Sequence, residues 1–133
     1  PHPKKLERLI GKWDDDNHKI KKIQKFIKKY NVILVLKGAH SFCFSKEEIF
    51  INNSGNAGMS TAGAGDVLSG VISGLMSQKY DPVIAAVFGV YLHGLAGDLA
   101  AEKMGYEALT AGEIINNLGG AFLELFREEE NLN

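Results

Sequence analysis

The sequence predicts an α/β fold, and three observations support this prediction. A lysine-rich amphipathic helix is expected over residues 18–30, and the five apolar residues 32–36 follow it directly as a strand. A glycine-rich loop at residues 53–65 leads into a further helix. Five consecutive apolar residues predict that strand 32–36 is buried on both faces. A helix, a short loop and a buried strand make half of a parallel βαβ unit.

Two helices are predicted before this strand, over residues 3–13 and 18–30, with a polar turn between them that can cap the second helix. The second helix carries most of its lysines away from one apolar stripe. The stripe has the spacing of a surface helix and consists of Ile20, Ile23, Phe26 and Ile27.

Two shorter strands and three helices are predicted after the buried strand. The strands are expected at residues 41–45 and 49–52, and the helices at residues 66–78, 82–104 and 110–128. Pro82 suits the first turn of its helix, and Thr110 with Glu113 three residues later forms a capping box.

The composition is that of one soluble domain. The chain has 133 residues, of which 45% are hydrophobic, and a net charge of −1. Residues 1–29 hold ten Lys/Arg and four Asp/Glu, but no aromatic pattern accompanies the lysines, so we interpret them as a solvated helix face and expect no nucleic-acid partner. No signal peptide is recognised at the start of the chain.

The sequence gives no sign of a membrane span or of a metal centre. The longest weakly polar stretch, Val83–Leu95, contains His93 and is judged too short to cross a bilayer. His93 and Asp98 do not share one helix face well, so helix packing is preferred to a metal site. Cys43 is the only cysteine and is expected to fill the core, which fits a reducing cytoplasm.

The glycine-rich run that ends in Gly63-Ala64-Gly65-Asp66 has the chemistry of an anion site. Glycines at 63 and 65 allow unusual backbone angles, so that successive N–H groups can converge on one ligand. A helix begins there, and its positive end attracts phosphate. Asp66 at such a position would be held ionised, as a general base must be.

Other glycine-rich motifs do not match this run. A Walker A loop needs Lys followed by Ser or Thr after its second glycine, but Ala64 and Gly65 follow Gly63. A dinucleotide fingerprint from Gly63 would place a third glycine at Leu68, and no Gly-x-Ser-x-Gly run of a nucleophile elbow is present. A plain connection that ends at an Asp helix cap is the remaining alternative.

The run Gly55–Gly70 resembles the signature of the ADP/ATP-dependent NAD(P)H-hydrate dehydratases of the ribokinase-like superfamily. Their phosphate loop is close to Gly-Asn-Pro-Gly-Met-Ala-Thr-Gly-Gly-Thr-Gly-Asp-Val-Leu-Ser-Gly. The resemblance extends in order to Pro1–Pro3, Val35–Ala39 and Gly89–Asp98. It implies a three-layer ribokinase-like α/β fold, of which residues 1–133 are the C-terminal portion of a single domain whose N-terminal half is absent.

The resemblance also implies the residues of the site. It places the hydrated nicotinamide on His2 and Asp66, with Asp66 as catalytic base. Lys37 ends the apolar strand, where a sheet often meets its ligand, and the resemblance makes it part of the nucleotide site. That nucleotide site comprises Lys37, Gly38, Ala39, His40, Ser41, Gly63, Ala64 and Gly65.

Four positions depart from the family pattern. Ala57 replaces the usual proline of the loop, and Lys5 stands where a glutamate usually follows the Pro-His-Pro run. His40 and Ser41 replace a smaller residue followed by threonine. The main functional groups are retained, whereas a polar contact near His2 is altered by Lys5.

The implied activity is that of a hydro-lyase that repairs the hydrates of NADH and NADPH, NADHX and NADPHX, with ADP or ATP as co-substrate and Mg²⁺ accompanying the nucleotide. We expect a cytoplasmic homo-oligomer without a membrane partner. Two alternatives stay open. One is a small-molecule kinase of the same superfamily, acting on a vitamin precursor or a sugar, and the other is a nucleotide-binding half-domain without catalytic activity.

We predict that residues 1–133, produced alone, fold poorly or associate strongly. The apolar strand at residues 32–36 requires partners on both edges, and an exposed apolar strand invites edge-to-edge association. Size-exclusion chromatography and thermal denaturation of this fragment test the prediction. A monomer with a sharp thermal transition would contradict it.

Overall fold

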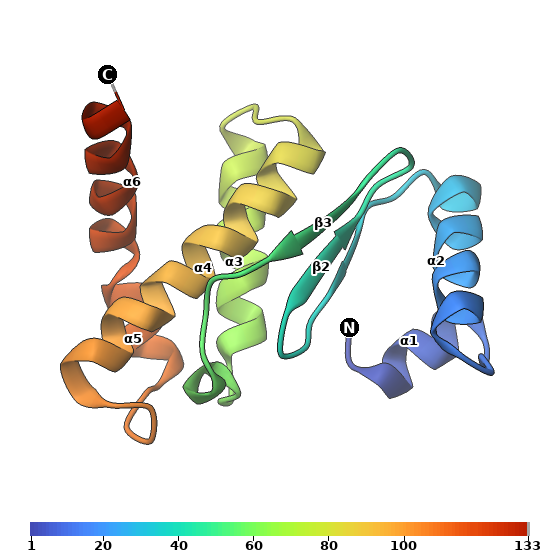
Figure 1. The fold of residues 1–133 in the computed structure, drawn as a ribbon, viewed down its shortest axis with the longest axis horizontal. Coiled ribbons are helices and arrows are strands. Elements are labelled where there is room, and N and C mark those ends of the chain that lie inside the picture. The colour runs from blue at the N-terminus through green and yellow to red at the C-terminus, as the bar shows by residue number, and fades with distance from the viewer. Residues whose placement is uncertain (133) are drawn as a thin grey trace. The chain divides into compact units, whose positions relative to one another are not determined.

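The computed structural model describes residues 1–132 and divides the chain into two compact units, Pro1–Asn52 and Asn53–Asn133 (Figure 1). The first unit holds α1 (Pro3–Ile10), α2 (Asp16–Tyr30), β1 (Leu34–Leu36), β2 (Ser41–Phe44) and β3 (Ile49–Asn52). The second holds the short 3₁₀ helix η1 (Ala57–Met59), α3 (Ala64–Ser77), α4 (Pro82–Met104), α5 (Ala111–Asn116) and α6 (Leu118–Leu132).

The first unit packs α1 and α2 against a three-stranded sheet of order β1-β2-β3. Both ladders are antiparallel, with Leu36 opposite Phe42 and Phe44 opposite Ile49. The predicted apolar stripe of α2 supplies part of the core. The buried residues of this core are Leu6, Ile23, Ile27, Leu34, Leu36 and Phe44.

The first strand is shorter and less buried than predicted. It begins at Leu34, and Val32 is 39% exposed. Asn31 takes a left-handed conformation at the end of α2, and the Val32 amide donates to the Ile27 carbonyl at 3.2 Å. Val32 therefore completes the helix terminus rather than joining the sheet. Among the described residues β1 pairs only with β2, so the predicted parallel neighbour is not found there.

Two further details of the first unit follow from local chemistry. The first helix ends at Ile10, before the predicted Trp13, because Gly11 takes a φ of 84° and its amide donates back to the Glu7 carbonyl at 2.8 Å. Cys43 lies in the core as predicted and is 2% exposed. Its burial raises the pKa of the thiol to about 11.

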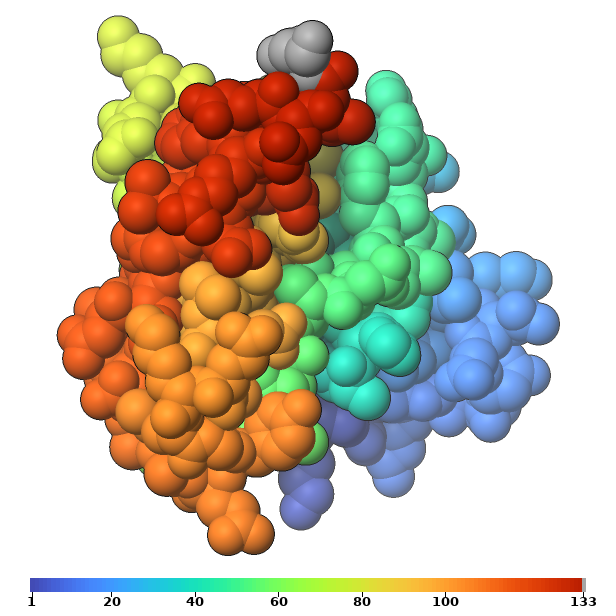
Figure 2. Space-filling model, turned by 60° about the vertical axis from the view of Figure 1, so that its left-hand side comes forward, coloured from blue at the N-terminus to red at the C-terminus, as the bar shows by residue number. Residues whose placement is uncertain are grey.

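The second unit is organised around α4, which packs against α3, α5 and α6. Figure 2 shows one face of this unit, with α6 in red beside the orange part of α4. On α4, Gly89 allows α3 to approach closely, because a Cβ atom at this position would stand 2.8 Å from Cγ1 of Ile72. The core of this unit includes Leu75, Leu92 and Ile114.

The segment that precedes η1 also lies close against α4. A Cβ atom at Gly94 would stand 2.0 Å from Oγ of Ser54 and 2.7 Å from its carbonyl carbon. A Cβ atom at Gly97 would stand 2.2 Å from Sδ of Met59. Any larger side chain at these two positions would displace the segment, so the glycines set its distance from the helix.

The α4 helix has the predicted bounds, Pro82–Met104. It is longer than the weakly polar stretch Val83–Leu95 on which the membrane expectation was based. Its 23 residues are long and apolar enough to cross a bilayer by length and composition, which corrects the expectation from Val83–Leu95 alone. However, 56% of its most apolar window is buried against the rest of the chain, as in the central helix of a folded core. We therefore interpret α4 as a core helix.

The final predicted helix is broken in two at Asn117. The buried Asn117 side chain donates from Nδ2 to the Glu113 carbonyl and accepts from Nζ of Lys103, both at 2.8 Å. A single helix was expected, whereas the structure has two, α5 and α6, on either side of this residue. The predicted N-cap is confirmed, since the Thr110 hydroxyl accepts from the Glu113 amide at 3.3 Å.

We predict that Gly94→Ala lowers the free energy of unfolding of the full-length protein by about 1–3 kcal/mol, because the added methyl group overpacks the contact with Ser54. Gly74→Ala is the matched control, since no atom outside the neighbouring helix backbone lies within 4 Å of its Cβ position on α3. The control should stabilise by roughly 0.5–1 kcal/mol through helix propensity. Urea denaturation measures both, and equal effects of the two substitutions would contradict the prediction.

Candidate functional site

The first turn of α3 has free backbone donors. Gly63 precedes the helix with a φ of 85°, and no side chain caps this end. The Ala64 amide donates to Thr61, and the first helical bond joins the Val67 amide to the Gly63 carbonyl. Within residues 1–132, the amides of positions 65 and 66 meet no acceptor.

This open helix end contrasts with the starts of three other helices. Side-chain oxygens of Asp15, Asp81 and Thr110 accept from the first-turn amides of α2, α4 and α5. At α3 the first-turn amides have no such acceptor and can donate to an external group, and the helix dipole favours a negatively charged one. The arrangement is suited to an anion such as phosphate.

The backbone angles correct two details of the prediction. Gly63 has the expected positive φ, whereas Gly65 lies in regular helix without one. Asp66 was expected to begin the helix but is its third residue, because a glycine rather than an acidic side chain occupies the cap position. Asp66 is nevertheless exposed in the first turn, where a carboxylate lies beside the free amides.

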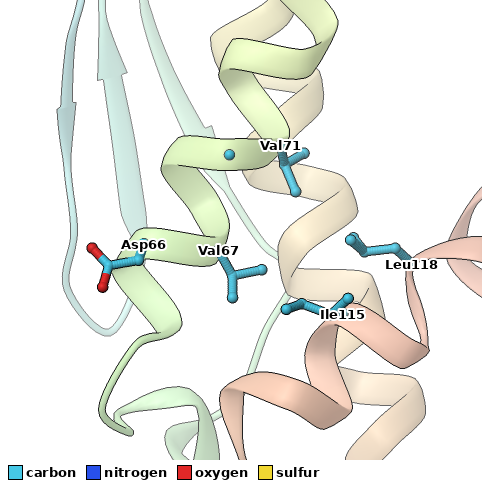
Figure 3. Close-up of a pocket in the computed structure, with 6 residues that line it drawn as sticks. Asp66, Val67, Val71, Ile115 and Leu118 are labelled. Carbon is cyan, nitrogen blue, oxygen red and sulfur yellow. The ribbon is translucent and has the colours of Figure 1, made fainter.

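An apolar cavity of about 460 Å³ lies beside Asp66. Figure 3 shows the Asp66 carboxylate pointing away from the apolar side chains, which come from α3 and from the junction of α5 and α6. The cavity is therefore walled by apolar side chains on one side of α3, and the Asp66 carboxylate points away from that wall. Its lining residues are Asp66, Val67, Gly70, Val71, Ile115 and Leu118.

The start of the glycine-rich loop is bound to α4 by a carboxylate. Oδ2 of Asp98 accepts from the Gly55 amide at 3.0 Å, and Oδ1 accepts from Nδ2 of Asn56 at 2.8 Å. Oδ1 of Asn56 in turn accepts from the Gly58 amide at 3.0 Å and so caps η1. Both oxygens of Asp98 are thus used by the loop.

The end of the loop is bound to the same helix by a histidine. Nε2 of the buried His93 lies 2.9 Å from the Ala64 carbonyl oxygen. A carbonyl can only accept, so Nε2 must carry a proton in this contact. The expectation that His93 and Asp98 serve helix packing is incomplete, because both side chains bind the loop.

The residues predicted from the first unit lie at its N-terminal end and around the hairpin between β1 and β2. His2 occupies the N-cap position of α1, with its carbonyl accepting from the Leu6 amide at 2.9 Å and no side-chain cap. Lys37 directly follows β1 and is half-buried, and residues 38–40 form an exposed hairpin turn. Ser41 opens β2.

The described residues contain no group of three or more His, Cys, Asp or Glu side chains placed to hold a metal ion.

Near Asp98, burial and the negative charges of Glu128, Glu124 and Asp98 raise the pKa of the Tyr91 hydroxyl.

The fold places the chain in the ribokinase-like class. A ribokinase-like superfamily protein from Enterococcus faecalis superposes with a TM-score of 0.73 at 33% identity, over 91% of this chain and 42% of its own. An ADP/ATP-dependent NAD(P)H-hydrate dehydratase from Bacillus subtilis, co-crystallised with ATP and Mg²⁺, superposes with a TM-score of 0.77 at 28% identity, over 93% of this chain and 46% of its own.

The sequence comparisons define the family more narrowly. The model of the NAD(P)H-hydrate dehydratase family matches residues 1–119. A bifunctional NAD(P)H-hydrate repair enzyme from Moorella thermoacetica is 39% identical over 99% of this chain and 26% of its own length. An ADP-dependent (S)-NAD(P)H-hydrate dehydratase from Neisseria meningitidis is 40% identical over 86% of this chain and 40% of its own length. The chain belongs to the NAD(P)H-hydrate dehydratase family and spans less than half the length of these relatives.

We predict that His93→Phe in the full-length protein lowers the free energy of unfolding by about 1–3 kcal/mol, because an aromatic ring is kept while the buried bond to Ala64 is lost. Amide hydrogen exchange in the first turn of α3 should also become faster. His40→Phe, at an exposed position, is the control. Unchanged stability and unchanged exchange in the His93 variant would contradict the prediction.

Proposed function

We propose that the full-length protein is a nucleotide-dependent dehydratase that repairs the hydrates of NADH and NADPH, using ADP or ATP. The observation that carries the proposal is the uncapped start of α3, with Asp66 in its first turn, within the region that the family model matches. Residues 1–133 would form the C-terminal portion of one three-layer ribokinase-like domain.

The transferred phosphate would bind at the open end of α3. The amides of Gly65 and Asp66 provide donors without reorganisation, and the turn at Gly63 holds them in place. Donors that are already oriented stabilise the charge that develops during phosphoryl transfer. We assign the Gly63-Ala64-Gly65 segment to this role.

The base of the nucleotide would use the apolar cavity beside α3. A planar heterocycle gains from contact with Val71, Ile115 and Leu118, while its phosphates require polar partners. From the first unit, we assign Lys37, Gly38, Ala39, His40 and Ser41 to nucleotide binding and His2 to the nicotinamide substrate. The Lys37 ammonium group supplies a positive point charge suited to phosphate.

The proposed reaction has two stages. Asp66 accepts the proton of the substrate hydroxyl, whose oxygen attacks the terminal phosphorus of the nucleotide and displaces the shortened nucleotide. The ring nitrogen then expels inorganic phosphate, and loss of a proton from the neighbouring carbon restores the dihydronicotinamide. Phosphorylation is required because phosphate is a much better leaving group than hydroxide.

We propose that Mg²⁺ accompanies the nucleotide, as in the Bacillus subtilis crystals. Because the described residues offer no group of three or more His, Cys, Asp or Glu side chains, the ion would take several of its ligands from phosphate oxygens and water. It would neutralise negative charge on the nucleotide. No residue of this chain is assigned as its ligand.

A small-molecule kinase would use Asp66 in the same way but stop at the phosphorylated product. The family match at residues 1–119 favours the dehydratase. Incubation with nucleotide and either NADHX or a hydroxymethyl vitamin precursor separates the two activities. Recovery of the absorbance of reduced nicotinamide supports the dehydratase, and accumulation of a phosphorylated alcohol supports the kinase.

We predict that Asp66→Asn reduces turnover of NADHX in the full-length protein by about a hundredfold to ten-thousandfold, because the amide cannot accept the substrate proton. Affinity for nucleotide, measured by calorimetry, should change far less. Asp81→Asn is the matched control, since asparagine also caps a helix. Turnover of the Asp66 variant within a few-fold of the wild-type rate would remove Asp66 from the base role.

A further inference from the structure

We infer that Asp98 is a positioning residue for the nucleotide site, acting through Asn56 to hold the glycine-rich loop in its binding shape. The inference rests on the proposed function, since it assigns the loop's ordering to nucleotide binding. Asp98 lies on α4, and its partners Gly55 and Asn56 are 43 and 42 residues away in sequence. Its position is set by the fold rather than by local turn chemistry.

The hydrogen-bond directions in this network are fully determined by the backbone donors. The Gly55 amide can only donate, so Oδ2 of Asp98 accepts. The Gly58 amide also can only donate, so the side-chain atom of Asn56 that faces it must be the oxygen Oδ1. Nδ2 of Asn56 then faces Asp98 and donates to its Oδ1. The amides of Gly55 and Gly58 and the Asn56 side-chain nitrogen each donate to an acceptor in the network, and both carboxylate oxygens of Asp98 are used.

The segment that needs this support is intrinsically flexible. Residues 55–63 include three glycines, and Gly55 and Gly63 have φ angles of 102° and 85°. Ordering such a segment costs much conformational entropy. If Asp98 holds the segment ordered before the ligand arrives, this cost is not subtracted from the binding energy of the nucleotide.

Packing alone does not fix the loop in this shape. Gly94 and Gly97 set how near the segment lies to α4, but a glycine contact does not select one backbone orientation. The two bonds to Asp98 orient the peptide at Gly55 and the side chain of Asn56. Asp98 therefore determines the orientation of the loop, and the glycines determine its distance from the helix.

An exchange of the two side chains tests the inference in the full-length protein. Asp98→Asn places an NH₂ group against a donor, and Asn56→Asp places two carboxylates together. In the double variant Asn56→Asp/Asp98→Asn, the amide on α4 can donate to the new carboxylate and accept from Gly55. The remaining carboxylate oxygen can accept from Gly58, so all bonds are restored.

Each single variant should weaken ADP and ATP binding by about tenfold to a hundredfold and accelerate amide exchange in residues 55–63 by a similar factor. The double variant should return both quantities to within a few-fold of wild type. Turnover should be affected mainly through KM for the nucleotide, with kcat changed less. Glu102→Gln, an exposed charge one turn further along α4, should change neither quantity.

If a single variant does not fold, the same test is made with the double variant and with Asn56→Ala. The Asn56→Ala variant leaves the bond between Gly55 and Asp98 in place. Asp98→Asn with wild-type nucleotide affinity and wild-type exchange would overturn the inference while the proposed function stands. A double variant as impaired as the single variants would also overturn it. A wild-type protein that neither binds nucleotide nor repairs NADHX would refute the proposed function, and the exchange measurements would still decide the role of Asp98.

Discussion

The close approach of neighbouring segments to α4 is the constraint on which the second unit depends. Three glycines of this helix, Gly89, Gly94 and Gly97, lie where a methyl group would collide with α3 or with the segment at residues 54–59. Glycine weakens an isolated helix, so α4 requires its packing partners in order to persist. Formation of the helix and shaping of the loop are therefore expected to be cooperative.

Elements with strong local signals could be predicted from the sequence. The bounds of α4 follow from Pro82, which suits a first turn, and from Gly105, which ends the helix with a φ of 80°. The N-cap at Thr110 and the burial of Cys43 have similarly local causes. The importance of the glycine-rich run was also recognisable, because few other roles require glycine, alanine and an acidic residue at a helix start.

The remaining features depend on partners that are remote in sequence. The Asn117 side chain, between α5 and α6, accepts a hydrogen bond from Lys103 on another helix, and a pattern of apolar positions contains no sign of that contact. The role of Asp98 was missed for the same reason, since its partners lie 42 and 43 residues earlier. A polar side chain on a helix with three tightly packed glycines was the only available signal, and it does not identify a partner.

The buried thiol of Cys43 has a consequence for the chemistry of the first unit. With its pKa raised to about 11 by burial, the group is almost wholly protonated at neutral pH. Oxidants and alkylating reagents act on the thiolate, so Cys43 is protected both by its low accessibility and by its protonation. This protection is the same in a reducing or an oxidising compartment, and the residue is therefore uninformative about where the protein works. It also leaves a newly introduced surface cysteine as the more reactive thiol of residues 1–132, which suits site-specific labelling of the loop.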